Sequence, residues 1–237
     1  MSWTDKKSLE HIKKIRDIFK VDVFIETGTY VGINALFQSK NFKKVITCEK
    51  VNEYYKKALK RLGKYENILT YNEDSSEFLK WLFKGDRLKT FTNNIPICYL
   101  DAHFYVKDCK NNLERFVVLK ELKALKNTNC IIIIHDFDNC LGHITYDDIS
   151  LDMELLKKDL LKVNSKFHFY TNELKSCDIL TLDEAKTMIL NNEIDKETYE
   201  EMISNLRYAW SKPDKTYRGL LYCLPKKVNI EGLREIK

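Results

Sequence analysis

The sequence predicts an α/β fold in which a mostly parallel β-sheet carries helices on both faces. Five short apolar runs alternate with helical segments between residues 8 and 137. The runs are continuously apolar, which is typical of strands that are covered on both faces. Each run also ends in an acidic residue or a histidine. Because the carboxyl ends of parallel strands meet at one edge of a sheet, we expect a ligand site at this edge.

The composition indicates a single cytoplasmic domain that spans residues 1–237. Hydrophobic residues make up 44% of the chain, charged residues 32%, and the net charge is +5, which is an ordinary balance for a globular domain. This charge is too small to predict a nucleic-acid partner. Seven dispersed cysteines without a C-x-x-C pair indicate a reducing compartment. We find neither a signal peptide nor the roughly 20 apolar residues of a membrane span.

The first half of the chain is expected to form the parallel part of the sheet. The spacing of apolar residues predicts helices over 8–20, 33–40, 52–64 (with Tyr55, Leu59 and Leu62 buried), 77–83 and 113–126. The apolar runs predict strands over 21–25, 44–48, 67–71, 95–100 and 130–134. We expect Ser75 or Ser76 to cap the helix that begins near residue 77, since serine favours this position.

The second half is expected to complete the sheet and to add a helical insertion. A helix is predicted over 152–161, and strands are predicted over 166–170 and 217–224. Between these strands a charged stretch, at about 178–212, contains predicted helices over 182–190 and 196–210. We interpret this stretch as an insertion over or beside the ligand site, serving as a lid or an oligomer contact.

The turn after the first predicted strand has the composition of a ligand-binding turn. Residues 21–32 read VDVFIETGTYVG, which is a buried strand, a glycine-bearing turn and the start of a helix. Glycine lets the backbone turn sharply and approach a ligand closely, and the helix start offers free N–H groups. The residues predicted to contact the ligand here are Glu26, Thr27, Gly28, Thr29, Tyr30 and Gly32.

The other strand ends supply further polar groups to the same predicted site. They are Glu49, Asp74 with Ser75, Asp101 with His103, and His135 with Asp136. Random surface polarity would not be so regular. The pattern therefore favours one ligand site that is built from five strand ends.

Together these motifs resemble the class I S-adenosylmethionine-dependent methyltransferases. ETGTYVG is similar to the motif that wraps the methionine end of the cofactor, Glu49 to the acid that holds the ribose diol, and Asp74-Ser75 to the adenine-contacting segment. YLDAHFY, LKELKAL and IIIIHDF resemble a bacterial subgroup with an L-D-A-H motif, distantly related to macrocin-type sugar O-methyltransferases. The resemblance covers about residues 21–137. It implies a Rossmann-like, seven-stranded, mostly parallel sheet with an antiparallel last strand.

The residues also favour a sulfonium cofactor over a dinucleotide. Glu49 follows Gly28 by 21 residues, the spacing at which a βαβ unit returns a carboxylate to a ribose in either case. A dinucleotide needs the pattern G-x-G-x-x-G, but Glu26 stands at the first glycine position. A carboxylate there would repel a diphosphate and would suit the positive end of S-adenosylmethionine.

The candidates for catalysis are Asp101, His103, His135 and Asp136. Methyl transfer to a hydroxyl benefits from a general base, by about 10²–10⁴-fold. His103 is the best-placed base because histidine titrates near neutral pH, and Asp136 is a candidate to orient it. In macrocin-type enzymes, aspartates at the ends of the fourth and fifth strands hold magnesium, which implies Asp101 and Asp136 as ligands here. Because histidine replaces an aspartate at both strand ends, we favour a metal-free site.

The resemblance implies an O-methyltransferase that acts on a sugar, free or nucleotide-linked, in glycan or natural-product biosynthesis. Two alternatives stay open at this point. One is a metal-assisted methyltransferase of a phenolic or other small hydroxyl compound, and the other is an inactive cofactor-binding module that serves a partner protein. A dinucleotide oxidoreductase is the least favoured. The expected partner is a small-molecule acceptor, and assembly into a homo-oligomer is left open.

Overall fold

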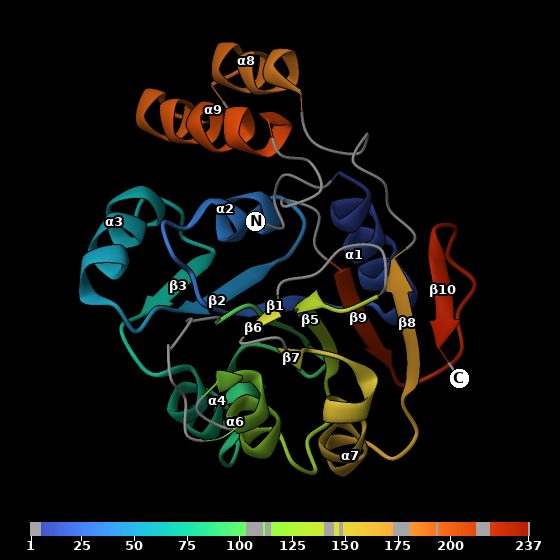
Figure 1. Cartoon of the computed structure of the whole chain (residues 1–237). Coiled ribbons are helices and arrows are strands. Elements are labelled where there is room, and N and C mark those ends of the chain that lie inside the picture. Colours follow the sequence, from blue (N-terminus) through green and yellow to red (C-terminus); the bar gives the residue numbers. More distant parts are fainter. Residues whose placement is uncertain are drawn as a thin grey trace.

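The computed structural model describes residues 6–102, 111, 115–139, 145–146, 149–172, 181–192, 194–211 and 219–236. An eight-stranded sheet lies at its centre, in the order β10-β8-β9-β5-β4-β1-β2-β3 (Figure 1). The strands are β1 (Val23–Thr27), β2 (Lys44–Cys48), β3 (Ile68–Tyr71), β4 (Ile97–Leu100), β5 (Ile131–Phe137), β8 (His168–Asn172), β9 (Gly219–Leu224) and β10 (Leu233–Ile236).

The pairing of the strands confirms the predicted fold class. The five strands from β3 to β5 in the sheet order are parallel to one another. Strand β9 is antiparallel to both β5 and β8, and β10 is antiparallel to β8. The sheet is therefore mostly parallel with antiparallel strands at one side. Strand β10, which the sequence did not suggest, adds an eighth strand to the predicted seven.

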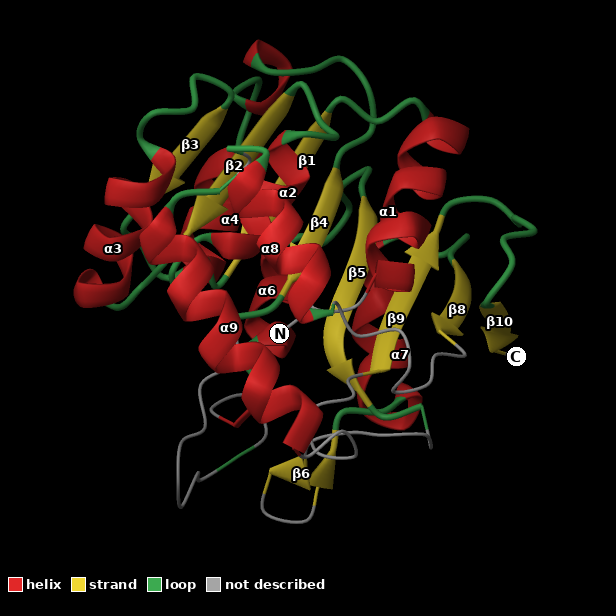
Figure 2. Ribbon diagram, turned by 90° about the horizontal axis from the view of Figure 1, so that it is seen from above, coloured by secondary structure: helices red, strands yellow, loops and turns green. Residues whose placement is uncertain are grey.

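Helices cover both faces of the sheet, as Figure 1 shows. One face carries α1 (Lys6–Phe19), α2 (Ile33–Ser39) and α3 (Asn52–Leu62), and the other carries α4 (Ser75–Phe83), α6 (Val118–Ala124) and α7 (Met153–Val163). A short 3₁₀ helix, Leu88–Thr90, follows α4. Helices α8 (Leu182–Leu190) and α9 (Lys196–Ser211) lie outside α2 and α3 (Figure 2). Both occur between β8 and β9 in the chain, where helices were predicted.

Each face of the sheet has its own apolar core, which explains why the strands are continuously apolar. Along β1, Phe24 packs in the core beneath α1, α2 and α3, and its neighbour Ile25 packs in the core on the side of α4, α6 and α7. Both side chains are fully buried. Successive side chains of a strand point to opposite faces, so the first three positions of β1, Val23 to Ile25, are all apolar.

Strand β5 is longer than predicted and carries two of the expected site residues inside it. The apolar run suggested an end at Ile134, but β5 continues through His135 and Asp136 to Phe137. Its pairing with β9 shifts register between His135 and Phe137, which is a β-bulge, and Asp136 has a φ of 60°. A bulge re-aims side chains at a sheet edge. The two residues therefore lie within the strand, not beyond it.

Two further predictions, on the cap of α4 and on the buried face of α3, were wrong. Helix α4 begins at Ser75, and its cap is Asp74, whose carboxylate accepts a hydrogen bond from the Ser76 N–H at 3.0 Å. On α3, Leu59 is 44% exposed instead of buried, because Ala58 and Leu62 face the core.

Other parts of the chain differ less from expectation. The helix predicted over 113–126 is observed as α6, whose bounds are shorter, and a two-stranded sheet of β6 (Thr145–Tyr146) and β7 (Ile149–Ser150) was not expected. Four cysteines within apolar segments are buried free thiols: Cys48, Cys98, Cys130 and Cys223. Among the helices that are described, none has the length and apolar character needed to cross a bilayer.

Candidate functional site

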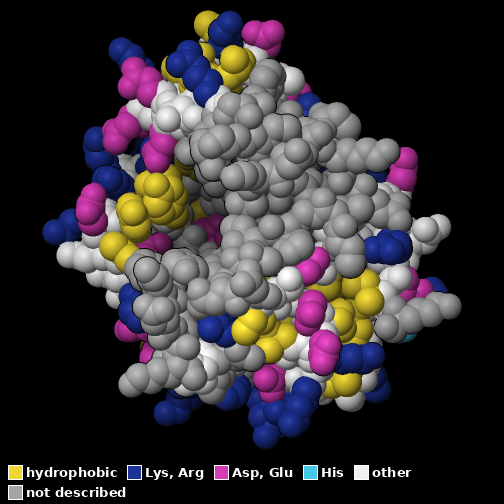
Figure 3. All heavy atoms as spheres, in the orientation of Figure 1, with side chains coloured by type: hydrophobic (Ala, Val, Ile, Leu, Met, Phe, Trp, Pro, Cys, Tyr) yellow, Lys and Arg dark blue, Asp and Glu magenta, His cyan; other side chains and the backbone are white. Residues whose placement is uncertain are grey.

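The carboxyl edge of the parallel strands gathers most of the predicted site residues. The arrowhead of β5 points to the lower side of Figure 2, which faces the viewer in Figures 1 and 3. In Figure 3, hydrophobic side chains gather over α3 beside a hollow in which acidic side chains are visible. We describe this edge strand by strand, beginning at β1.

The β1–α2 turn, residues 28–32, adopts a conformation that requires glycine at two positions. Gly28 and Gly32 have φ angles of 78° and 84°, and Tyr30 has a φ of 52°. A Cβ added to Gly28 would lie 2.8 Å from the Ala102 Cα at the end of β4, which is closer than real Cβ contacts allow. The turn therefore passes directly against the end of β4, and only glycine, which has no Cβ, allows this close approach.

Glu26 lies beneath this turn, fully buried, and its two oxygens are held by separate donors. Asn34 Nδ2 donates to Glu26 Oε1 at 2.6 Å, and Thr47 Oγ1 donates to Glu26 Oε2 at 2.7 Å. The pKa of Glu26 is raised to about 8, chiefly by burial and to a smaller extent by the nearby Asp101 and Glu49. The two hydrogen bonds act in the opposite direction and lower this pKa. At pH 7 the carboxyl is therefore mostly protonated. A mostly protonated Glu26 repels a diphosphate less than the ionised carboxylate that was assumed from the sequence.

Glu49 follows the last residue of β2, and each of its carboxylate oxygens accepts a hydrogen bond from a backbone N–H group. Its Oε2 accepts a hydrogen bond from the Tyr30 N–H and its Oε1 accepts one from the Val51 N–H, each at 2.8 Å. The residue is 8% exposed. Each carboxylate oxygen can accept a second hydrogen bond, so Glu49 presents two fixed acceptors at the edge, suited to a pair of vicinal hydroxyls.

Tyr30 stands at the rim of the site and does not pack on the sheet. The residue is 48% exposed, and its ring lies 4.6 Å from that of Tyr54 on α3, centroid to centroid. A left-handed conformation is costly for a tyrosine. The strain is offset in part by the hydrogen bond from its N–H to Glu49.

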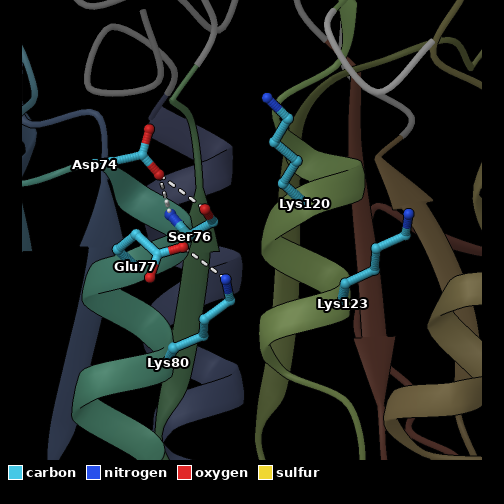
Figure 4. A pocket seen from close by; sticks show the side chains of 6 residues that line it. All are labelled: Asp74, Ser76, Glu77, Lys80, Lys120 and Lys123. Carbon is cyan, nitrogen blue, oxygen red and sulfur yellow. Dashed lines mark hydrogen bonds and ion pairs between the residues drawn. The ribbon is translucent and has the colours of Figure 1, made fainter. Parts of the chain in front are cut away.

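At the end of β3, Asp74 is occupied as a helix cap and an ion-pair partner. Besides capping α4, it pairs with Lys50 Nζ at 3.0 Å. A surface cleft of about 410 Å³ begins at Asp74 and runs between α4 and α6, lined by Asp74, Ser76, Glu77, Lys80, Lys120 and Lys123 (Figure 4). Figure 4 shows the lysines of both helices along this cleft. The cleft lies on the outer face of the helices, and Asp74 is the one predicted site residue that lines it.

At β4 and β5 the predicted residues Asp101, His135 and Asp136 come together. His135 Nδ1 lies 2.9 Å from Asp101 Oδ1 and 3.1 Å from Asp136 Oδ1. The side chains of His135 and Asp136 are 4% and 5% exposed, whereas that of Asp101 is 22% exposed. Burial lowers the pKa of His135, but Asp101 and Asp136 outweigh it and raise the pKa above 6.5. A solvent-reachable carboxylate thus contacts a buried imidazole whose pKa is raised by its two carboxylate neighbours.

Glu121 is a buried acid that the sequence analysis did not single out as a site residue. It lies on α6 and is 1% exposed. Burial raises its pKa to about 7, while hydrogen bonds from the hydroxyls of Thr27 and Ser75 lower it; Asp101 and Asp74 raise it further. A glutamate on the apolar face of a predicted helix was the available signal. One carboxyl oxygen of Glu121, Oε1, is buried without a hydrogen-bond partner among the residues that the structure describes.

The remaining histidines divide into structural ones and ones that cannot be placed. His103, the predicted base, and His143 lie outside the described residues. His11 is 2% exposed, with Nε2 3.0 Å from the Glu231 carbonyl oxygen, which is a structural contact. His168 pairs with Glu235 at 3.6 Å, far from the site in the sheet order. Within the described part of the chain, no group of three or more His, Cys, Asp or Glu residues is arranged to hold a metal ion.

Comparison with solved structures shows that this fold is shared with methyltransferases. The plantazolicin methyltransferase BamL, solved with S-adenosylhomocysteine, matches with a TM-score of 0.51 and 14% identity, over 95% of this chain and 86% of its own. The methyltransferase domain of a bacterial Hen1 protein matches with a TM-score of 0.46 and 11% identity, over 92% and 98% of the two chains. At such identities the likeness to BamL shows the fold: the chain has the Rossmann-like fold of S-adenosylmethionine-dependent methyltransferases.

A third comparison covers less of both proteins. The O-methyltransferase TomG from Streptomyces achromogenes, solved with S-adenosylmethionine, matches with a TM-score of 0.38 and 13% identity. The match covers 55% of this chain and 55% of TomG, so the chain spans about half the length of that relative. No protein-family model matches the sequence, and no curated protein matches it.

The buried acids make stability depend on pH in a predictable direction. A glutamate whose pKa rises from 4.5 to about 8 on folding keeps its proton in the native state and loses it in the unfolded state. Stability should therefore fall as pH rises through this window, by on the order of 1.4 kcal/mol per pH unit. In the Glu26→Gln variant, the free energy of unfolding should decrease less steeply as pH rises to about 8. Urea unfolding between pH 5 and 9 measures this difference.

Glu121→Gln is the matched comparison for this experiment. The pKa of Glu121 is about 7. Glu121 therefore contributes to the pH dependence of stability over a window that ends about one pH unit lower than the window of Glu26. An unchanged slope in the Glu26→Gln protein would show that Glu26 is ionised in the native state.

Proposed function

We propose that this chain is an S-adenosylmethionine-dependent O-methyltransferase whose acceptor is a hydroxyl of a sugar, free or nucleotide-linked. The observation that carries the proposal is the convergence of Glu26, Glu49 and the Asp101–His135 pair at one sheet edge, beneath a glycine turn. The fold shared with methyltransferases supports it. So does the motif resemblance of about residues 21–137 to the methyltransferases with an L-D-A-H motif.

The residues at the edge fit this cofactor. Glu49, with two fixed acceptor oxygens, would hold the ribose hydroxyls, and the β1–α2 turn, which Gly28 lets pass against the end of β4, would wrap the methionine end. Glu26 would release its proton when a positive amino group approaches, because a nearby cation favours the ionised carboxyl. Asp74 and Ser75 would flank the adenine. When bound, the cofactor supplies an activated methyl group on a positively charged sulfur.

The Asp101–His135 pair would receive the proton that the acceptor hydroxyl loses. Asp101 is the more exposed member, and His135 contacts it at 2.9 Å from the buried side. A proton taken at Asp101 would be shared with the imidazole. Asp136 contacts the same ring nitrogen and so keeps the imidazole oriented. His103, two residues after Asp101, is the second candidate for this role.

A metal-assisted methyltransferase of a phenolic or other small hydroxyl compound is the second candidate function. It is favoured by one observation, namely that Asp101 and Asp136 both lie within 3.1 Å of the same imidazole nitrogen. Carboxylates held this close could share a divalent cation if His135 turned away. An inactive cofactor-binding module is the third, and detectable methyl transfer to an acceptor would refute it.

Cofactor binding is tested with Glu49→Gln. Losing a charged hydrogen bond costs about 1.5–3 kcal/mol, so the affinity for S-adenosylmethionine should fall about 10- to 150-fold. Isothermal titration calorimetry gives the dissociation constants. Glu53→Gln is the control, because Glu53 is an exposed α3 residue that pairs with Lys57. If the unmodified protein fails to bind at hundreds of micromolar cofactor, the proposed function is wrong.

The roles of His135 and His103 are distinguished by measuring kcat and the cofactor dissociation constant of a variant at each position. If the Asp101–His135 pair is the base, His135→Gln should lower kcat about 10²–10⁴-fold and leave the cofactor dissociation constant almost unchanged. His103→Ala should then have the smaller effect on kcat. The opposite order would assign the base to His103. Thermal unfolding of each variant checks that the buried substitution leaves the fold intact.

Metal dependence separates the first two candidate functions. The sugar O-methyltransferase that we favour should keep full activity after exhaustive treatment with EDTA and removal of the chelate, because its proton acceptor is a side-chain pair. Activity that is lost and then restored by a divalent cation would favour the metal-assisted alternative. Assays before and after adding Mg²⁺ or Mn²⁺ measure the difference.

A further inference from the structure

Helix α9 is attached to α3 by a row of ion pairs. Lys60 contacts Glu197 at 2.6 Å, and Lys64 contacts Asp195, just before α9, at 3.2 Å. The side chains of both pairs are largely exposed, so each pair contributes little to stability. A third pair lies between them along α3, and it differs because it is buried.

Arg61 forms this third pair. Its side chain is 6% exposed, and its Nη2 donates to Glu201 Oε2 at 2.8 Å. Its Nε donates to the Thr198 hydroxyl at 2.8 Å. In the part of the chain that the structure describes, Glu201 is the carboxylate that pairs with this guanidinium. Removing one partner of a buried ion pair leaves an uncompensated charge, and α9 supplies the carboxylate that balances Arg61.

The same guanidinium reaches the β1–α2 turn. Arg61 Nη1 donates to the carbonyl oxygen of Val31. Val31 lies between Tyr30 and Gly32, both of which have left-handed backbones. Burial, Tyr54 and Glu201, in that order, raise the pKa of Tyr30, so Glu201 also lies within electrostatic reach of the turn. Figure 2 shows α9 crossing over α2 beside α3.

We propose that Arg61 is a positioning residue that couples α9 to the β1–α2 turn, so that the Glu201 carboxylate helps to set the cofactor affinity. By holding the Val31 carbonyl, Arg61 fixes the turn in the conformation that directs the Tyr30 N–H to Glu49. The helices between β8 and β9 are then part of the cofactor site. The inference rests on the proposed function for the identity of the cofactor.

Two α9 variants test the coupling, because Glu197 and Glu201 are one helical turn apart and each pairs with α3. Glu201→Gln removes the charge that Arg61 needs, whereas Glu197→Gln removes an exposed pair that does not touch the turn. The affinity for S-adenosylmethionine should fall about 5- to 150-fold in Glu201→Gln, the usual range of coupling between sites. It should change less than twofold in Glu197→Gln. Arg61→Lys keeps a positive charge but loses the planar guanidinium that donates to several partners at once. Its affinity for S-adenosylmethionine should therefore fall by a similar factor to that of Glu201→Gln.

A second readout does not involve the cofactor. In the ligand-free protein, the Tyr30 N–H is hydrogen-bonded to Glu49 and the Gly32 N–H to the Thr29 carbonyl. Hydrogen exchange at these two amides should be faster in Glu201→Gln than in Glu197→Gln, at matched thermal stability.

Equal effects of the two variants on either readout overturn the proposal, because the helices would then act only as a docked support. If the unmodified protein does not bind S-adenosylmethionine, the proposed function fails. The exchange rates alone then decide whether Arg61 sets the turn.

Discussion

The two hydrogen bonds to the Glu26 carboxyl connect the elements on which the rest of the site depends. Asn34 belongs to α2 and Thr47 to β2, so one side chain of β1 fixes the helix and the neighbouring strand at the point where the turn leaves the sheet. With both partners in place, the turn can pass close against β4. Burying this acid is costly unless it is hydrogen-bonded or protonated, and here both conditions are met.

Burial also changes what Glu26 can do. A permanent carboxylate would discriminate against a diphosphate by repulsion, which was the argument from sequence. A carboxyl with a pKa of about 8 discriminates through its proton: a cation favours ionisation, and an anion favours the neutral form. The preference for a positively charged cofactor is therefore retained, but it is coupled to proton release and depends on pH.

The elements that were predicted from sequence are those in which local pattern and packing agree. The apolar strands and the helices 33–39 and 182–190 needed only periodicity, and the strand ends Glu26, Glu49 and Asp101 followed from them. What escaped prediction depends on partners distant in the chain. Strand β5 continues through His135 because β9 pairs with it, and Arg61 is buried because α9, about 140 residues later, supplies its carboxylate.

Buried charge explains why α8 and α9 cannot be regarded as a dispensable addition to the sheet. Helix α3 carries a cation on its inner face, where an apolar residue would suffice for packing, and that cation contacts a backbone carbonyl of the β1–α2 turn. Without Glu201, the site would contain an uncompensated charge beside the turn. The turn, α3 and α9 therefore reach their final geometry together. A change of sequence in α9 that removes this carboxylate should therefore disturb the turn unless Arg61 is replaced as well.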